Sequence, residues 1–297
     1  MIKSLEKLQP HTRGLLYISF TAFLWSSSGL FIKVLTLGAF QISFFRSAIA
    51  GITILAISII AKRKPKFERD LISNLCALSY AAILIFFVLA TKMTTAANAI
   101  FLQFTAPIYL LFLEPIFLKT KFRIRDLITI IFCIAGMALF FFGKLDTGSI
   151  YGNVFAILSG ISFAFFSLFL KWKKQLHKSA NTLNNLIVGN FLVSIICLPL
   201  IFDGLSVSLT ESLILIYMGA IQIGVSYMIF NEGIKYVSAT ESMIIAMLEA
   251  MFNPIWVYVG IGEEPSGYAI IGAAIIFAAI LVHNIRSPRK KKMLLVD

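Results

Sequence analysis

The sequence is poor in charge and has very few cysteines and histidines. Charged residues make up 13% of its 297 residues, about half of the roughly 25% found in soluble globular domains. Cys76, Cys133 and Cys197 are far apart, and each lies inside an apolar run, which fits neither a disulfide framework nor a zinc site. The three histidines each lie beside a basic segment at the end of an apolar run. We therefore expect no metal site and no cofactor.

Motifs that carry enzyme chemistry are also missing. The chain has no HExxH motif, no G-x-S-x-G motif and no histidine in the middle of an apolar run. A membrane-embedded enzyme acting on lipid or peptide would need a nucleophile with its base, or a metal cluster, at one membrane depth. The G-x-x-x-x-G-K-[ST] loop of ATP-driven proteins is absent too. We expect that the protein is not an enzyme, and keep the membrane-embedded enzyme as an alternative.

Apolar side chains are abundant, at 59% of the chain, and they occur in runs of about 20 residues. A helix of that length crosses a hydrocarbon core about 30 Å thick. The pattern predicts an all-α polytopic membrane protein embedded in a lipid bilayer. Its ten transmembrane helices are expected over residues 14–35, 39–61, 71–91, 95–118, 124–142, 150–170, 182–202, 212–231, 239–260 and 267–285.

Lysine and arginine are distributed unequally between the connections. If the N-terminus is cytoplasmic, 22 of the 26 basic residues fall on the inner side, Lys33, Lys92 and Lys144 fall outside, and Arg46 lies within a span. This is the asymmetry of the positive-inside rule. It predicts a multi-pass protein of the cell inner membrane with both termini cytoplasmic and a basic tail, residues 286–297, as an anchor. Because the charge of +12 is spread between the runs, we expect no nucleic-acid partner.

The two halves of the chain repeat each other. A shift of 138 residues aligns GLLYISFTAFLWSSSGLFIK (14–33) with GNVFAILSGISFAFFSLFLK (152–171), and a shift of 143 aligns ATKMTTA (90–96) with GIKYVSA (233–239). Five spans in each half invert the second copy in the membrane, and inverted repeats bind substrate near the midplane between the halves. We predict two inverted five-helix repeats, residues 1–143 and 144–285.

Several short motifs resemble those of EamA-like members of the drug/metabolite transporter superfamily. The first half has Trp25 followed by small residues and Lys33, then Arg46 early in the next span. The second half has VSATESMIIAMLEAMFNPIW (237–256), Gly262-Glu263 and GAAIIFAAILV (272–282). The resemblance implies ten helices and transport of a small metabolite, such as an amino acid or a related compound. We expect a secondary transporter working by alternating access, in the export direction, with a passive channel as a further alternative.

Polar side chains within the spans are the candidate substrate ligands, because an ionisable group there costs about 2.5–3.5 kcal/mol and tends to face a cavity. Glu249 lies near the middle of its span, and Gln103 is its counterpart in the first half. We expect the two to face each other at the midplane, with Glu249 binding a substrate amine or a proton. The predicted substrate-binding residues are Trp25, Ser26, Arg46, Tyr80, Gln103, Tyr227, Glu249 and Asn253.

Three charged residues near the ends of spans have simpler readings. Arg46 lies about seven residues into its span, so its side chain either binds substrate or only packs, and it is long enough to reach back to the outer interface. Glu114 and Glu241 lie near cytoplasmic ends. For these two we expect exposure to solvent or pairing with the basic loops.

Overall fold

The structure is a computed structural model that describes residues 8–62, 70–142, 149–176, 182–201, 205–261 and 266–285. Within 248–261 it does not describe the side chains of residues 253–255, 257, 260 and 261. Helices account for nearly all of these residues, and none of them forms a strand. The predicted tail 286–297 and Gly262-Glu263 lie outside the described residues.

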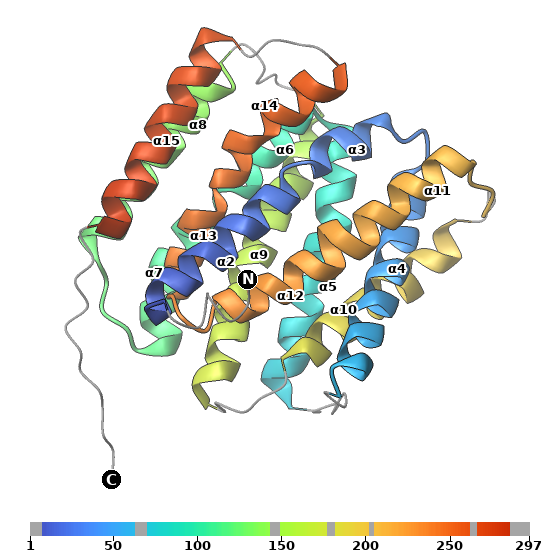
Figure 1. The fold of residues 1–297 in the computed structure, drawn as a ribbon, viewed down its shortest axis with the longest axis horizontal. Coiled ribbons are helices and arrows are strands. Elements are labelled where there is room, and N and C mark those ends of the chain that lie inside the picture. The colour runs from blue at the N-terminus through green and yellow to red at the C-terminus, as the bar shows by residue number, and fades with distance from the viewer. Residues whose placement is uncertain are drawn as a thin grey trace.

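The described residues of the first half form seven helices, which Figure 1 shows in blue to green. They are α2 (Pro10–Trp25), α3 (Ser28–Val34), α4 (Ala39–Ile60), α5 (Leu71–Met93), α6 (Ala96–Gln103), α7 (Ala106–Leu118) and α8 (Ile124–Phe140). The second half follows with α9 (Ile150–Leu176), α10 (Leu183–Cys197), the 3₁₀ turn η1 (Leu198–Leu200), α11 (Leu209–Ile216), the π-helix η2 (Tyr217–Val225), α12 (Ser226–Gly233), α13 (Ala239–Ala246), α14 (Leu248–Ile261) and α15 (Gly267–Ile285).

Each of the ten predicted apolar runs is helical over most of its length within the described residues. Eight of the resulting helical segments are long and apolar enough to cross a membrane. Two runs differ: α8 has 17 residues, about 26 Å at 1.5 Å per residue, and the run from Ala239 is interrupted at Met247. Helix α9 is longer than expected and continues to Leu176.

Three runs that were expected to be continuous are broken near their middles. The first breaks between Trp25 and Ser28, where the hydroxyl of Ser26 donates to the carbonyl of Phe23 at 2.7 Å and that of Ser27 to Leu24 at 3.3 Å. Such side-chain bonds compete with the helical backbone pattern. The interruption therefore has a local cause in the consecutive serines.

The fourth run breaks between α6 and α7 because of Pro107. A proline inside a helix removes one N–H and its ring clashes with the carbonyl four residues earlier, here that of Gln103. A neighbouring helix packs closely at this point: a Cβ added at Gly160 of α9 would lie 2.7 Å from the Gln103 carbonyl oxygen. The ninth run breaks at Met247, which the 143-residue shift relates to Phe104.

The helices of the two halves pack in matching pairs. Helix α5 packs on α9, and α2 packs on α12; α10 packs on α5, and α4 packs on η2. Exchanging the two halves converts the α5–α9 pair into the α12–α2 pair, and the α10–α5 pair into the α4–η2 pair. Helices α4 and α10 pack on each other, as do α8 and α15, which lie side by side at one edge of the bundle (Figure 1).

Side-chain contacts repeat in the same way. The Nζ atom of Lys33 donates to the carbonyl of Thr94 at 2.8 Å, and that of Lys171 donates to the carbonyl of Val237 at 2.6 Å. The two lysines are related by the 138-residue shift, and the two acceptors by the 143-residue shift. Lys33 lies in the last turn of α3, although the sequence placed it in an outer loop. Its ammonium group satisfies the carbonyl of Thr94, which has no helical partner at the end of α5.

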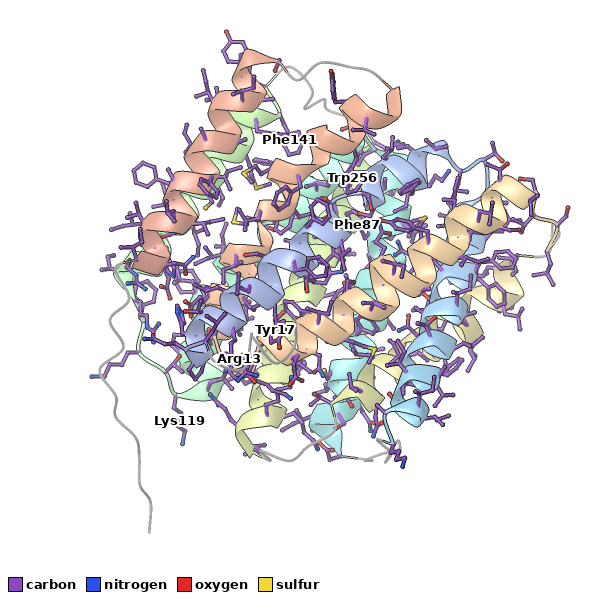
Figure 2. The ribbon with its side chains drawn as sticks, in the orientation of Figure 1. Arg13, Tyr17, Phe87, Lys119, Phe141 and Trp256 are labelled. Atoms are coloured by element: carbon purple, nitrogen blue, oxygen red, sulfur yellow. The ribbon has the colours of Figure 1, made fainter. Side chains whose placement is uncertain are left out.

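Large apolar side chains cover the outside of the bundle (Figure 2). They include Ile60, Ile116, Ile195, Leu213 and Leu281, all at least 47% exposed. In water such a surface would be an aggregation liability, whereas hydrocarbon solvates it. The outer surface and the hydropathy of the helices agree in indicating a membrane protein.

The pair formed by α8 and α15 depends on glycine at the contact. A Cβ added at Gly272 would lie 2.5 Å from the carbonyl oxygen of Gly136 and 2.6 Å from the amide nitrogen of Phe140. Both atoms belong to the backbone, so no side-chain rotation relieves the clash. A Cβ added at Gly267, on the same helix, meets nothing within 4 Å.

We predict that Gly272→Val lowers the free energy of unfolding by roughly 1–3 kcal/mol, as overpacking does. The measurement is the thermal unfolding of the purified protein in detergent, with Gly267→Val as the matched control expected to unfold like the parent. Equal melting temperatures for the two variants would show that α8 and α15 are not packed as described.

Candidate functional site

A small cavity lies in the buried centre of the bundle, where the helix breaks meet. Its volume is about 40 Å³, room for about three water molecules at roughly 10–15 Å³ each, and too little for a metabolite. Side chains from both halves line it: Trp25, Ser28, Arg46, Ile83, Leu84, Phe87, Gln103, Phe163, Gln222, Ile223, Tyr227 and Glu249.

Arg46 extends from α4 into this cavity. Its residue is only 2% exposed, so the expected alternative, a side chain reaching the outer interface, is wrong. Its Nη2 atom donates to the carbonyl of Leu84 at 2.8 Å, while its Nε atom has no acceptor among the described residues. A buried guanidinium thus keeps a hydrogen-bond donor without a partner.

Glu249 reaches the same cavity from the opposite half. It lies in the first turn of α14 and is 3% exposed. The partial positive charge at a helix N-terminus favours a carboxylate there. Within the part of the chain that the structure describes, the Glu249 carboxylate has no hydrogen bond, and no salt bridge joins it to Arg46. The cavity therefore contains one buried cation and one buried carboxyl group that do not neutralise each other directly.

Gln103 and Trp25 line the cavity next to helix breaks. The Nε2 atom of Gln103 donates to the hydroxyl of Ser159 at 2.8 Å. Gln103 and Glu249 line the same cavity, as expected, but no hydrogen bond joins them directly. The indole Nε1 of Trp25 donates to the hydroxyl of Ser226 at 2.7 Å, and its ring packs 4.7 Å from that of Tyr227.

Two other predicted site residues, Tyr80 and Ser26, lie outside the cavity wall. Tyr80 is fully buried behind Tyr227, at 4.7 Å between ring centroids, and accepts a hydrogen bond from Asn190 at 3.2 Å. Ser26 accepts a hydrogen bond from the indole of Trp256 at 2.7 Å and is also buried. The side chain of Asn253 lies outside the described residues.

Two polar side chains of the cavity are not among the predicted substrate-binding residues. They are Ser28, which begins α3, and Gln222, which lies in the π-helix η2. Both are polar residues within apolar runs, so the criterion that selected Gln103 applied to them as well. What separates them from other serines and glutamines is their place at a helix irregularity, which the sequence pattern did not reveal.

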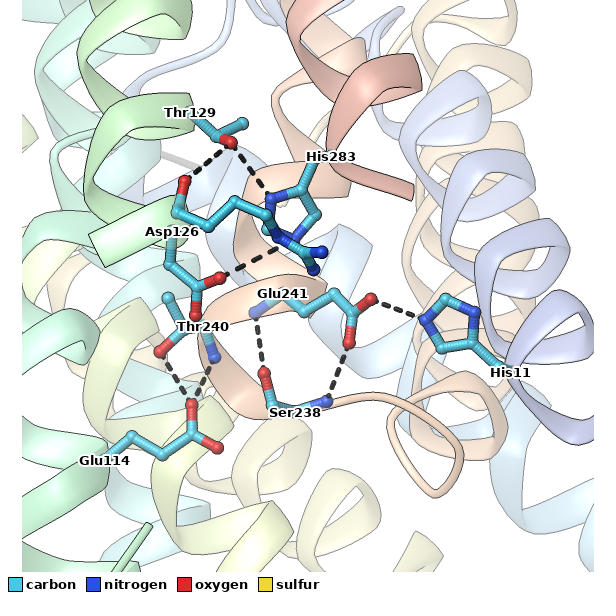
Figure 3. Close-up of polar contacts among 9 residues, drawn as sticks. His11, Glu114, Asp126, Thr129, Ser238, Thr240, Glu241 and His283 are labelled. Carbon is cyan, nitrogen blue, oxygen red and sulfur yellow. Dashed lines mark hydrogen bonds and ion pairs between the residues drawn. The ribbon is translucent and has the colours of Figure 1, made fainter. Parts of the chain in front are cut away.

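A second polar group, which we call the end network, lies at the end of the bundle where α2 begins (Figure 3). His11 and Glu241 are joined by a contact of 2.6 Å between Nε2 and Oε1. The carboxylate of Glu114 accepts from the amide of Thr240 at 2.7 Å and from its hydroxyl at 2.6 Å. Glu114 and Glu241 are 4% and 1% exposed, so the expected exposure to solvent is wrong.

The end network continues across to the last helix. The Nδ1 atom of His283 lies 3.0 Å from the hydroxyl oxygen of Thr129, and its Nε2 atom lies 3.7 Å from the carboxylate of Asp126. These contacts connect α8 to α15, and those of Glu114 and His11 connect α7 and α2 to α13. No group of histidine, cysteine, aspartate and glutamate among the described residues has the arrangement of a metal site.

Comparisons with known proteins match this chain to a transporter family model and to several transporters. The model of the EamA-like transporter family matches residues 12–142 and 150–285. An uncharacterized transporter, YxxF, of Bacillus subtilis is 24% identical over 278 residues, covering 90% of this chain and 88% of that protein. An uncharacterized transporter of Archaeoglobus fulgidus is 25% identical over 282 residues, covering 89% and 95% of the two chains.

Two further matches are more limited in what they imply. Solute carrier family 35 member G1 of Mus musculus is 32% identical over 144 residues, or 46% of this chain and 39% of that protein. A crystal structure with a TM-score of 0.79 covers 94% of this chain and 100% of its own, at 15% identity, and so supports the fold alone. Because the family model matches both halves and nearly the whole sequence, the chain belongs to the EamA-like transporter family.

Proposed function

We propose that this protein is a secondary transporter that exports a small metabolite carrying both an amine and a carboxylate, such as an amino acid, across the inner membrane. The observation that carries the proposal is the pair of buried, unneutralised groups in one central cavity, Arg46 and Glu249. Membership of a transporter family supports the general activity, and the cavity chemistry supports the substrate class.

The charges of a zwitterionic substrate would complement those of Arg46 and Glu249. Ionisable side chains in a membrane interior are costly unless they are paired. A zwitterion brings one charge for each: its carboxylate toward the free Nε donor of Arg46 and its ammonium toward Glu249. Neutral polar compounds would leave both groups unpaired, and a singly charged compound would leave one. Transfer of a proton to and from Glu249 is the accompanying proposal for coupling.

We further propose that all ten runs cross the membrane, as two inverted repeats over residues 1–143 and 144–285, with both termini cytoplasmic. The matching helix pairs and the matching contacts of Lys33 and Lys171 support the repeat. The unequal distribution of lysine and arginine supports the orientation. On this arrangement the end network lies at the cytoplasmic side.

Alternating access requires that the cavity open to one side at a time. A cavity of about 40 Å³ excludes a metabolite, so this conformation fits a closed state. The end network joins helices of both halves through buried polar contacts, and opening toward the cytoplasm would have to break them. We therefore propose that the end network is the cytoplasmic seal.

We predict that Glu249→Gln lowers transport at least about tenfold, since a hydrogen bond to a charged group contributes about 1.5–3 kcal/mol. The measurement is counterflow of radiolabelled amino acids in proteoliposomes between pH 5 and pH 8. Glu232→Gln is the matched control, because Glu232 pairs with Lys235 at the surface. Full transport by Glu249→Gln with an unchanged pH profile would contradict the role of Glu249, and wild-type flux that never exceeds equilibration would indicate a channel.

We predict that Glu241→Gln loosens the cytoplasmic seal. Glutamine keeps the capping arrangement with Ser238 but removes the charged partner of His11. The measurement uses a cysteine at the cavity position Ser28 in a background without native cysteines, labelled by a membrane-impermeant maleimide in inside-out vesicles. Labelling should be several-fold faster in Glu241→Gln than in the parent or in Glu232→Gln. Identical rates in all three would argue against a seal.

A further inference from the structure

The π-helix η2 is the most unusual backbone feature in the described residues, and the proposed function above assigns it no role. Its nine residues, Tyr217–Val225, lie within a run for which the sequence predicted an ordinary helix. π-Helices make up well under 1% of residues in proteins and frequently occur at functional sites. Here η2 contributes Gln222 and Ile223 to the wall of the central cavity.

The π-helix is held against the break in the first run by a set of hydrogen bonds. The indole of Trp25 donates to the hydroxyl of Ser226 at 2.7 Å, and that hydroxyl donates to the backbone carbonyl of Gln222. Thr21 donates to the carbonyl of Ser226 at 3.3 Å. On its other side η2 approaches α4 closely: a Cβ added at Gly219 would lie 2.7 Å from the carbonyl oxygen of Arg46. The position of Gln222 is thus determined by two neighbouring helices.

The side chain of Gln222 is anchored at one end only. It is 1% exposed, and its Nε2 atom donates to the hydroxyl oxygen of Ser27 at 2.8 Å. The Ser27 hydroxyl also lies 3.2 Å from the hydroxyl of Tyr217. Its own proton is donated to the carbonyl of Leu24 at 3.3 Å, which leaves its oxygen to accept from Gln222. This assigns the amide orientation from the hydrogen-bond network. The Oε1 atom of Gln222 then has no donor among the described residues.

An acceptor buried without a donor costs folding free energy. Because Gln222 belongs to the cavity wall, a bound substrate could supply the missing donor. We propose that Gln222 Oε1 accepts an N–H group of the substrate and, together with Glu249, forms a recognition site for a primary ammonium group. This inference rests on the proposed function and adds a specificity-determining residue to it. Arg46, which lines the same cavity, holds the carboxylate of the same substrate.

The chemistry of such a site discriminates by the number of N–H groups. A primary ammonium has three, enough to donate to the amide oxygen and the carboxylate together. A trimethylated ammonium has the same charge and none to donate, so it would leave Gln222 Oε1 unpaired. Sites built to hydrogen-bond a substrate group reject analogues that lack it much more strongly than sites that recognise shape or charge alone.

The test measures binding to purified protein in detergent by the fluorescence of its tryptophans, since Trp25 lines the cavity. The probes are L-alanine, L-leucine, L-lysine and L-glutamate, each compared with its α-N,N,N-trimethyl derivative. We expect wild-type protein to bind at least one primary amine about tenfold or more tightly than its trimethylated form. Gln222→Met, similar in size but without the acceptor, should reduce this preference about tenfold, as expected for a lost hydrogen bond to a charged group.

Two controls separate recognition from a general loss of structure. Gln222→Glu keeps an acceptor and should keep the preference for the primary amine. Gln175→Met, at an exposed glutamine near the end of α9, should behave as wild type. A melting temperature for Gln222→Met within a few degrees of wild type would establish that this variant is folded. If Gln222→Met is not folded, the preference for the primary amine is measured in Gln222→Asn, which keeps an acceptor on a shorter side chain.

The outcomes distinguish this inference from the proposed function. If wild-type protein binds a primary amine but prefers it no more than the trimethylated form, or if Gln222→Met keeps the wild-type preference, the role of Gln222 is wrong and the transporter proposal stands. If wild-type protein binds none of the eight probes, the proposed substrate class is wrong and this inference fails with it.

Discussion

Lipid offers the backbone no hydrogen-bond partners, and this constraint governs where the helices of this chain can be interrupted. Each interruption, between Trp25 and Ser28, between Gln103 and Ala106, and at Met247, lies in the buried interior. There, serine hydroxyls and closely packed helices satisfy or cover the freed groups. The cavity forms at these breaks, where backbone ends and polar side chains come together away from lipid.

The three breaks and the π-helix η2 form a symmetric pair and an asymmetric pair. Those after Gln103 and at Met247 occupy equivalent positions in the two halves. The break at Ser26 and Ser27 has no equivalent, since residues 164–165 lie inside the continuous helix α9, and the counterpart of η2, residues 74–82, lies inside α5. The symmetric pair contributes Gln103 and Glu249 to the cavity, whereas the asymmetric pair contributes Gln222. The features shared by the two halves thus place Gln103 and Glu249 at the cavity, and a feature found in one half alone adds the polar side chain of Gln222.

The two ends of the bundle also diverged. Glu241 and its counterpart Asn98 both lie in the first turn of a helix capped by serine or threonine. Asn98 makes neutral contacts with Thr94 at 3.1 Å and Asn153 at 3.2 Å, whereas Glu241 contacts His11. Asn98 thus lies among amide and hydroxyl groups beside the ammonium of Lys33, whereas Glu241 lies among carboxylates and histidines. A difference of this kind is consistent with the proposal that the two ends open at different times.

The sequence by itself determined the helices, the family and much of the cavity wall. Runs of about 20 apolar residues must be helical in lipid because each backbone group needs a partner within its own segment, and polar residues such as Arg46 and Glu249 inside those runs must face protein. Only the tertiary structure decided the rest. The π-helix is held by Trp25, 201 residues from Ser226, and His283 is buried against Thr129, 154 residues away. Local sequence cannot specify contacts between segments that meet only when the whole bundle has packed, and these contacts decide which polar atoms are left unpaired to face the cavity.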